Sequence, residues 1–341
     1  MNRITIGIVS YLLPTCLCTQ WLHFRQPGIP RTPDGKPDLT APLPRTSDGK
    51  PDLSGLWAPA PNPYPLDLIG DIKNETIFKP AAEAMFQKHI NDYRRDDPAI
   101  HCLPLGPAEA LGGSWRIIQS PAVVGLLHSS GNYRQIFLDG REPPKDPDPT
   151  WRGYSVGHWE GDTLVVETSG FNDRSWLDRA GHPHSESLRV TERFHRVDFG
   201  HMQFEMTFHD PETLTEPLTI SLAVNYLPDT EMSEYVCENE RDVPHLVGRM
   251  NEGVKVSPAT LATYAGTYEF REGPPGFPGR PVTFAEVNGR LYSGVLPMVP
   301  QSETRFDSLD GVWQFSLDAS GTVTGVIRSE AEGDFRYVRR P

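Results

Sequence analysis

The residues of this chain whose types and spacing could do chemistry are concentrated in the hexapeptide 181–186, which reads GHPHSE. Side chains alternate along an extended backbone, so His182, His184 and Glu186 would face the same side. Two imidazoles and a carboxylate can supply three ligands to a divalent metal and leave one position open for water. The sequence does not identify the metal, and the metal interpretation depends on His182 and His184.

The same three side chains also suit acid–base chemistry, because imidazole titrates near neutral pH. We therefore treat His182, His184 and Glu186 as candidate catalytic residues. The alternative is a loop whose histidines bond to backbone groups, with Pro183 setting the shape of the loop. The sequence leaves the metal, the catalytic and the structural interpretations open.

The preceding segment, FNDRSWLD at 171–178, contains an aromatic ring between acidic residues. Asn and Asp clusters are typical of turns. Trp176 beside Asp173 and Asp178 would also suit a sugar or a polyphenol, with the ring as a platform and the carboxylates accepting from hydroxyls. Asp173 and Trp176 are therefore candidate ligand contacts, with a plain turn as the first interpretation.

A predicted strand at 188–196 places Arg193 on its polar face, while Glu192 interrupts the apolar face. A carboxylate on an apolar face is costly unless it is paired, and we expect a neighbouring strand to supply the partner. If that face lined a barrel cavity, Glu192 and Glu205 would be ligand or acid–base candidates. A structural ion pair is the alternative for Glu192.

His158 and Trp159 border a tight hairpin and point to opposite faces, so one of them should look into the same cavity. The predicted ligand-binding residues are therefore His158, Trp159, Asp173, Trp176, Arg193 and Glu205. We further expect one pocket to be lined by His158, Trp176, His182, His184 and Glu186, because loops that carry these residue types contribute little to a core.

The elements that must position these residues are mostly strands. Short β patterns follow one another from Trp115 onward, and Glu160-Gly161-Asp162 is a strong hairpin signal. In 201–209, apolar residues alternate with polar ones without error, which is typical of a half-buried strand. About eight antiparallel strands predict a lipocalin-like barrel or a sandwich over 66–250, with one helix at 80–95.

The flanking regions have distinct compositions. Residues 27–65 form a Pro-rich extended arm with a near-repeat, PRTPDGKPDL then PRTSDGKPDL, whose end at 53–57 should dock as an edge strand. A linker at 251–257 precedes a small all-β domain at 258–341, whose first strand pattern is LATYAGTYEF.

The first 26 residues predict an export signal, with Arg3 before an apolar run from Ile4 to Cys18. This run is too short for a comfortable membrane span, so we expect a periplasmic or secreted protein with no transmembrane span after cleavage. A disordered or wrongly assigned chain start is the alternative.

Cysteine usage and charge bound the chemistry further. Once a leader is removed, Cys102 and Cys237 remain, and two cysteines in an exported protein usually pair. Two buried free thiols are the alternative.

The net charge is −13 and no Lys/Arg-rich run occurs, which argues against nucleic acid as a partner. A small-molecule ligand is the expected partner.

Two resemblances add to this. The strings TPDGKPDLSG, GYSVGHWEGDTLVVETSGFND, GHPHSESLRVTERF and DFGHMQFEMTFHDP resemble a family of exported bacterial β-rich proteins of uncharacterised function, over about residues 30–242. The tail, with LATYAGTYEF, VNGRLY, SETRFDS and VWQFSLDASGTVTGVI, resembles the small β-domain appended to serine hydrolases of the β-lactamase type. The hydrolase domain itself has no counterpart here. The resemblances imply fold and export, and no reaction.

Three functions remain open from the sequence. The first is an exported barrel protein that binds a small organic or carbohydrate-like ligand. The second is a hydrolase or lyase that uses a His/carboxylate pair or a His-bound metal. The third is a structural module of the cell envelope.

Overall fold

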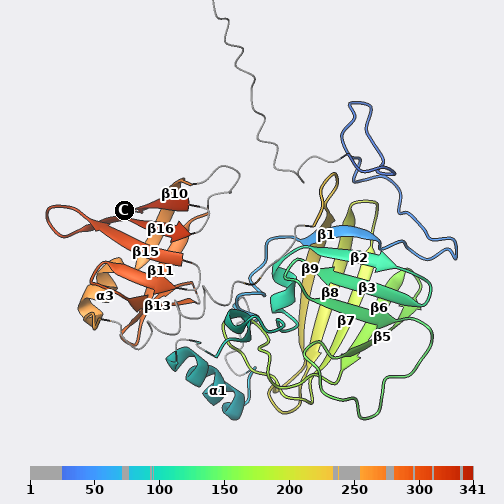
Figure 1. The fold of residues 1–341 in the computed structure, drawn as a ribbon, viewed down its shortest axis with the longest axis horizontal. Helices are drawn as coiled ribbons and strands as arrows, with labels where there is room; N and C mark the ends of the chain where they lie inside the picture. The colour runs from blue at the N-terminus through green and yellow to red at the C-terminus, as the bar shows by residue number, and fades with distance from the viewer. Residues whose placement is uncertain are drawn as a thin grey trace, which may run out of the picture.

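The computed structural model describes residues 25–70, 77–92, 94, 96–232, 237, 254–273, 280–294, 296–308, 311–330 and 333–340. These residues form two closed β-barrels with little helix (Figure 1). The mostly β fold and the second all-β unit expected from the sequence are confirmed. The predicted export signal lies outside the described residues except for its last two. Within the described part of the chain, no helix is long and apolar enough to cross a membrane.

The first barrel, on the right of Figure 1, closes in sequence order, because each strand pairs with the next and β9 pairs back with β1. Its strands are β1 (Gly55–Pro59), β2 (Trp115–Gln119), β3 (Val123–His128), β4 (Tyr133–Phe137), β5 (Tyr154–Glu160), β6 (Thr163–Ser169), β7 (Arg189–Arg196), β8 (His201–His209) and β9 (Leu218–Tyr226). The expectation of an edge strand at 53–57 is wrong. β1 bonds to both β2 and β9, so the closed barrel has no free edge there.

The alternation in β8 shows why these residues form a barrel wall. Met202, Phe204, Met206 and Phe208 are all buried in the core, and the residues between them face outward. β7 and β9 bury their apolar side chains in the same core. This confirms the half-buried strand predicted for 201–209, because a period of two puts one face of each strand inside.

The Pro-rich arm contains two copies of one turn, and each copy is tied to the barrel by its arginine. Arg31 binds the carboxylate of Asp229, beyond β9, with N···O distances of 2.5 and 2.6 Å. Arg45 binds Asp162, in the turn between β5 and β6, at 2.6 and 2.9 Å. The near-repeat in the sequence is therefore a repeated anchor.

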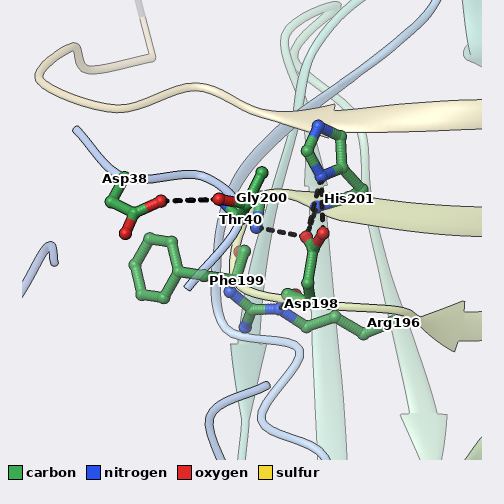
Figure 2. A network of polar contacts seen from close by, with 7 residues as sticks. All are labelled: Asp38, Thr40, Arg196, Asp198, Phe199, Gly200 and His201. Atoms are coloured by element: carbon green, nitrogen blue, oxygen red, sulfur yellow. Dashed lines mark hydrogen bonds and ion pairs between the residues drawn. The ribbon is translucent and has the colours of Figure 1, made fainter. Parts of the chain in front are cut away.

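Between these anchors the arm lies against the turn that joins β7 to β8 (Figure 2). The backbone N–H of Gly200 donates to the carbonyl of Leu39 at 2.7 Å. A Cβ at Gly200 would lie 2.4 Å from the Cβ of Leu39, so a larger residue does not fit without movement. Asp198 shapes the turn, because its carboxylate accepts from the Gly200 N–H and lies 2.8 Å from Nδ1 of His201.

Arg196 closes this end of the barrel. It is 2% exposed and donates to the backbone carbonyls of Asp52, Asp198 and Phe199. Its guanidinium lies 4.8 Å from the centre of the Trp57 ring, an attractive cation–π geometry. Burial lowers the pKa of Arg196 to about 10, so the side chain stays charged at neutral pH.

The helix predicted at 80–95 is α1 (Pro80–Asn91), with Pro80 at its first position as expected. The chain continues through the short helices η1 (Pro98–His101) and η2 (Glu109–Gly112). Cys102, directly after η1, is disulfide-bonded to Cys237, which confirms the predicted pairing. The bond joins the segment before β2 to the segment after β9.

The second barrel begins with a helix, α3 (Pro258–Tyr264), where the sequence pattern suggested a strand. Ser257 caps this helix by accepting the N–H of Thr260 at 3.1 Å, and Pro258 occupies the first turn, so local capping prevails over the β pattern. Trp313 is fully buried in an aromatic core. The strands are β10 (Gly266–Glu272), β11 (Val282–Val287), β12 (Arg290–Ser293), β13 (Leu296–Pro300), β14 (Arg305–Ser308), β15 (Gly311–Leu317), β16 (Val323–Glu330) and β17 (Gly333–Arg339).

Candidate ligand-binding site

His182, the first of the predicted catalytic residues, is locked in place in the loop between β6 and β7. Its Nδ1 lies 2.6 Å from Oδ2 of Asp178, and the residue is 2% exposed. Phe78 stacks on its ring at a centroid distance of 4.7 Å and Phe86 at 4.2 Å. The imidazole therefore packs as part of the core beneath α1.

Asp178 holds this loop together. Its carboxylate accepts the backbone N–H groups of Leu68 at 2.6 Å, Gly181 at 3.1 Å and His182 at 3.2 Å, in addition to the His182 ring. An ionised carboxylate has about four lone-pair sites, and these four contacts use them. The carboxylate of Asp178 is therefore satisfied by protein groups alone.

This pair belongs to the one cluster of potential metal ligands found among the described residues. The ligand atoms of Asp67, Asp178 and His182 lie within 4.8 Å of one another. A metal bound to Asp178 would have to displace the N–H donors that already occupy its oxygens. His184 is not in this cluster, so the predicted pair of metal ligands, His182 and His184, is not brought together around one ion site.

His184 has a different set of partners. Its Nε2 lies 2.8 Å from Oγ of Ser175, and its Nδ1 lies 3.1 Å from the carbonyl of Ser185. Only a protonated Nδ1 can donate to a carbonyl, so Nε2 accepts from the serine. Burial lowers the pKa of His184, which keeps the ring neutral. Ser175 and His184 resemble a nucleophile and its base, but they are 1% and 4% exposed and line none of the cavities described below.

The remaining predicted residues of this loop lie apart. Trp176 is buried and stacks on His89 at 4.3 Å. Asp173 is exposed in the turn, as the first interpretation had it. Glu186 is exposed and lines a groove of about 270 Å³ with the proline-rich loop 144–149.

His158 lies on β5, opposite Val165 and on the outer face, where its Nε2 is 3.3 Å from Glu160. Trp159 is the residue of this pair that points inward, and it packs against the core. The expectation of one pocket lined by His158, Trp176, His182, His184 and Glu186 is not met, because these residues are distributed between the barrel wall, the core and a surface groove.

Arg193 and Glu205 face outward and lie directly opposite each other on β7 and β8. With His195 and Gln203 they line a groove of about 570 Å³ on the outer surface of the barrel. These two predicted ligand-binding residues therefore do meet at a concave surface, although it lies outside the barrel and not in its cavity.

A different opening lies in the barrel wall itself. β4 and β5 run parallel, whereas all other neighbouring strands of the first barrel are antiparallel. Their register pairs are Ile136 with Ser155 and Phe137 with Val156. On the N-terminal side of these pairs, the two segments bound a cleft of about 490 Å³. It is lined by residues 131–135 and 150–155, with Pro104 and Phe137. We call this opening the seam cleft.

Aromatic rings form much of the seam cleft. Tyr133 is 67% exposed, so its ring is open to solvent at this cleft. Phe137 and Tyr154 stack at 5.3 Å, and the guanidinium of Arg174 lies 4.8 Å from the centre of the Trp151 ring. Rings presented in this way are typical of sites that receive planar or sugar-like ligands.

Two arginines line both the seam cleft and a small cavity inside the barrel. Arg134 forms a two-pronged contact with Glu192, with N···O distances of 2.9 and 2.8 Å. Arg152 donates to the carbonyl of Leu105 at 2.8 Å and lies 3.0 Å from Nε2 of His128. The cavity behind them is about 20 Å³, room for about one water molecule.

Arg134 is the partner that the sequence analysis expected for Glu192, the carboxylate on an otherwise apolar strand face. Both side chains are nearly buried, at 7% and 3% exposure. The partner comes from β4, which is not a neighbour of β7 in the sheet, so the expectation of an adjacent strand is corrected. Barrel closure brings the two strands face to face across the interior.

Sequence reasoning missed the residues of the seam cleft. A usable signal existed in YRQIF, since Arg134 occupies the same face as the buried Ile136. Arg134 lies on one apolar face and Glu192 on another. A buried cation and a buried anion need partners, so the sequence pattern predicts that the two form a pair. The rings of Tyr133 and Trp151 carry no comparable signal, because strands and loops commonly contain aromatic residues.

Two motifs of serine hydrolases also occur in the chain, and the structure explains both without catalysis. Residues 153–157 read Gly-x-Ser-x-Gly, but Ser155 lies within β5 and bonds to Thr168 at 2.8 Å in the barrel interior. A nucleophile elbow requires a strand-to-helix turn. Residues 47–50 read Ser-x-x-Lys, but they form one of the turns of the arm.

Comparison with protein-family models, with curated proteins and with solved structures finds no match.

Proposed function

We propose that this protein is an exported binding protein for a small organic or carbohydrate-like molecule, and that the seam cleft is its binding site. The observation that supports this most is the cleft of about 490 Å³ with aromatic rings and arginines in its lining. Ligand sites typically combine apolar surface with a few polar groups in a concavity of this size.

The export part of the proposal is supported by the Cys102–Cys237 disulfide. Disulfides persist in oxidising compartments and are rare in the cytosol. The apolar N-terminal run is consistent with the same location.

The barrel interior is not the proposed site. Core side chains fill the interior except for a cavity of about 20 Å³, which is too small for an organic ligand. Catalysis by His182 and His184 is also left out of the proposal, because both rings are buried and bonded to protein groups.

A thermal-shift screen of the mature protein with monosaccharides, uronic acids and aromatic acids tests the proposal. A ligand at a hundred times its Kd should stabilise the fold by about 2.7 kcal/mol and raise the unfolding midpoint. Tyr133→Ala and Trp151→Ala should each weaken binding at least tenfold. Ile118→Ala, at a comparably exposed position on β2 at 56%, should leave binding unchanged.

Two outcomes contradict the proposal. One is a panel in which no compound shifts the midpoint, which favours the structural envelope module. The other is binding that survives Tyr133→Ala and Trp151→Ala but is lost with Arg193→Ala, which moves the site to the outer groove on β7 and β8.

A further inference from the structure

The lining of the seam cleft differs in charge from the overall composition of the chain. The protein has 45 acidic and 32 basic residues, a net charge of −13. The residues that line the cleft nevertheless include two arginines, Arg134 and Arg152, and no carboxylate. An arginine-lined site in an acidic protein favours an anionic ligand over a cationic one.

Arg134 has a donor directed away from its carboxylate partner. Its terminal nitrogens contact Glu192, and the residue is 7% exposed. Within the described residues, its Nε has no hydrogen-bond partner. A buried N–H needs an acceptor, so a water or a ligand oxygen must complete this site.

The aromatic residues of the cleft indicate what kind of ligand carries the oxygen that accepts from Arg134. Tyr133 and Trp151 both line the cleft, and Arg174 stacks on Trp151 at 4.8 Å. A ring can lie against these side chains while an anion attached to it accepts hydrogen bonds from the arginines, since N–H groups of a guanidinium bind carboxylate oxygens strongly.

We propose that the ligand of the seam cleft is a carboxylic acid with a ring, and that its carboxylate is received by Arg134 and Arg152. This inference rests on the proposed function, because it assigns the chemical class of the molecule bound at the same site. Uronic acids and aromatic acids share this chemistry, and the experiment distinguishes them.

The test is isothermal titration of the mature protein with two matched pairs of probes, glucuronate against glucose and benzoate against benzamide. At least one acid should bind tenfold or more tightly than its uncharged partner. A preference for glucuronate over glucose identifies a uronic acid, and a preference for benzoate over benzamide identifies an aromatic acid. Raising the salt concentration from 0.05 to 0.5 M should weaken the acid more than the neutral probe, because salt screens the attraction of a free anion to the cleft.

The paired variant Arg134→Met with Glu192→Leu removes the guanidinium without leaving a buried charge. It should abolish the preference for the acid while the neutral probe binds as before. Glu192→Gln provides a second variant, because it removes the negative charge that faces Arg134 and should tighten the acid severalfold. Each variant is first checked for a cooperative unfolding transition.

The outcomes separate this inference from the proposed function. Equal affinity for acid and neutral probe, with binding still dependent on Tyr133, overturns the carboxylate assignment and leaves the binding function in place. An acid preference that persists in the paired variant overturns the role of Arg134. If none of the four probes binds, both proposals fail.

Discussion

Arg134 and Glu192 meet inside the first barrel from strands that are not neighbours, with β5 and β6 between them in the sheet. Their contact is two-pronged and almost fully buried. It ties the strand on one side of the seam to the opposite wall of the barrel. The ion pair therefore braces the barrel beside the β4–β5 seam, where two register pairs join the strands.

Removing one member of this pair should be costly. Glu192→Leu leaves a buried guanidinium without its carboxylate, and we expect a loss of about 3–5 kcal/mol in the free energy of unfolding. Arg134→Met combined with Glu192→Leu should recover most of that loss, because no buried charge remains. Urea denaturation measures both. A double variant as unstable as the single variant would show that packing, and not charge, dominates here.

The pH dependence of stability should carry a contribution from His184. Burial lowers the pKa of His184 from its ordinary value of 6.5, so the folded protein takes up this proton less readily than the unfolded chain. Stability is therefore fully present above pH 6.5 and falls as the pH drops below it, by at most about 1.4 kcal/mol per pH unit. His89, whose pKa burial also lowers, adds to the same trend.

His184→Gln should flatten this dependence between pH 6.5 and 5, measured by denaturation at several pH values. His158→Gln, at an exposed position, is the control and should leave the slope unchanged. An unaltered slope in His184→Gln would rule out His184 as the source.

The disulfide should contribute strongly, because it spans 135 residues. In the chain-entropy model a loop of this length is worth at most about 5 kcal/mol. Cys102→Ala with Cys237→Ala should lower the unfolding midpoint, and thiol titration of the denatured, non-reduced mature protein should find no free thiol. Two reactive thiols would refute the bond.

Docking of the arm should depend on Gly200. Gly200→Ala places a Cβ 2.4 Å from that of Leu39, and we expect a loss of about 1–3 kcal/mol with faster proteolysis within 27–53. Gly125→Ala is the matched control, since its nearest neighbour would lie 3.9 Å away, an ordinary contact. Equal proteolysis of the two variants would mean that the arm is held by its arginine anchors alone.

The second barrel should fold by itself. Residues 254–341 contain a closed barrel with the fully buried Trp313, and Arg290 reaches across to the carbonyls of Ile90 and Asn91 at the end of α1. The isolated fragment should unfold cooperatively with a change in Trp313 fluorescence. A chain without a transition would show that it needs the first barrel.

Local patterns in the sequence were sufficient for the elements of this fold. The error-free alternation of 201–209, the Glu160-Gly161-Asp162 turn and Pro80 at a helix start each act within a few residues, so strands, hairpin and α1 follow from them. The isolation of Cys102 and Cys237 was sufficient for the disulfide. Capping by Ser257 is equally local, but it was hidden by a β pattern and α3 was missed.

The site was decided by tertiary structure alone. His182 and His184 look like ligands in the sequence, but the fold supplies Asp178, Phe78 and Ser175 as their partners and buries them. The seam cleft depends on β4 and β5 meeting in parallel across the connection 138–153, and the Arg134–Glu192 pair depends on closure of the barrel. A sequence pattern specifies which face a residue occupies. The residue that packs opposite it is determined only when the strands close into a barrel, because that contact joins residues far apart in the chain.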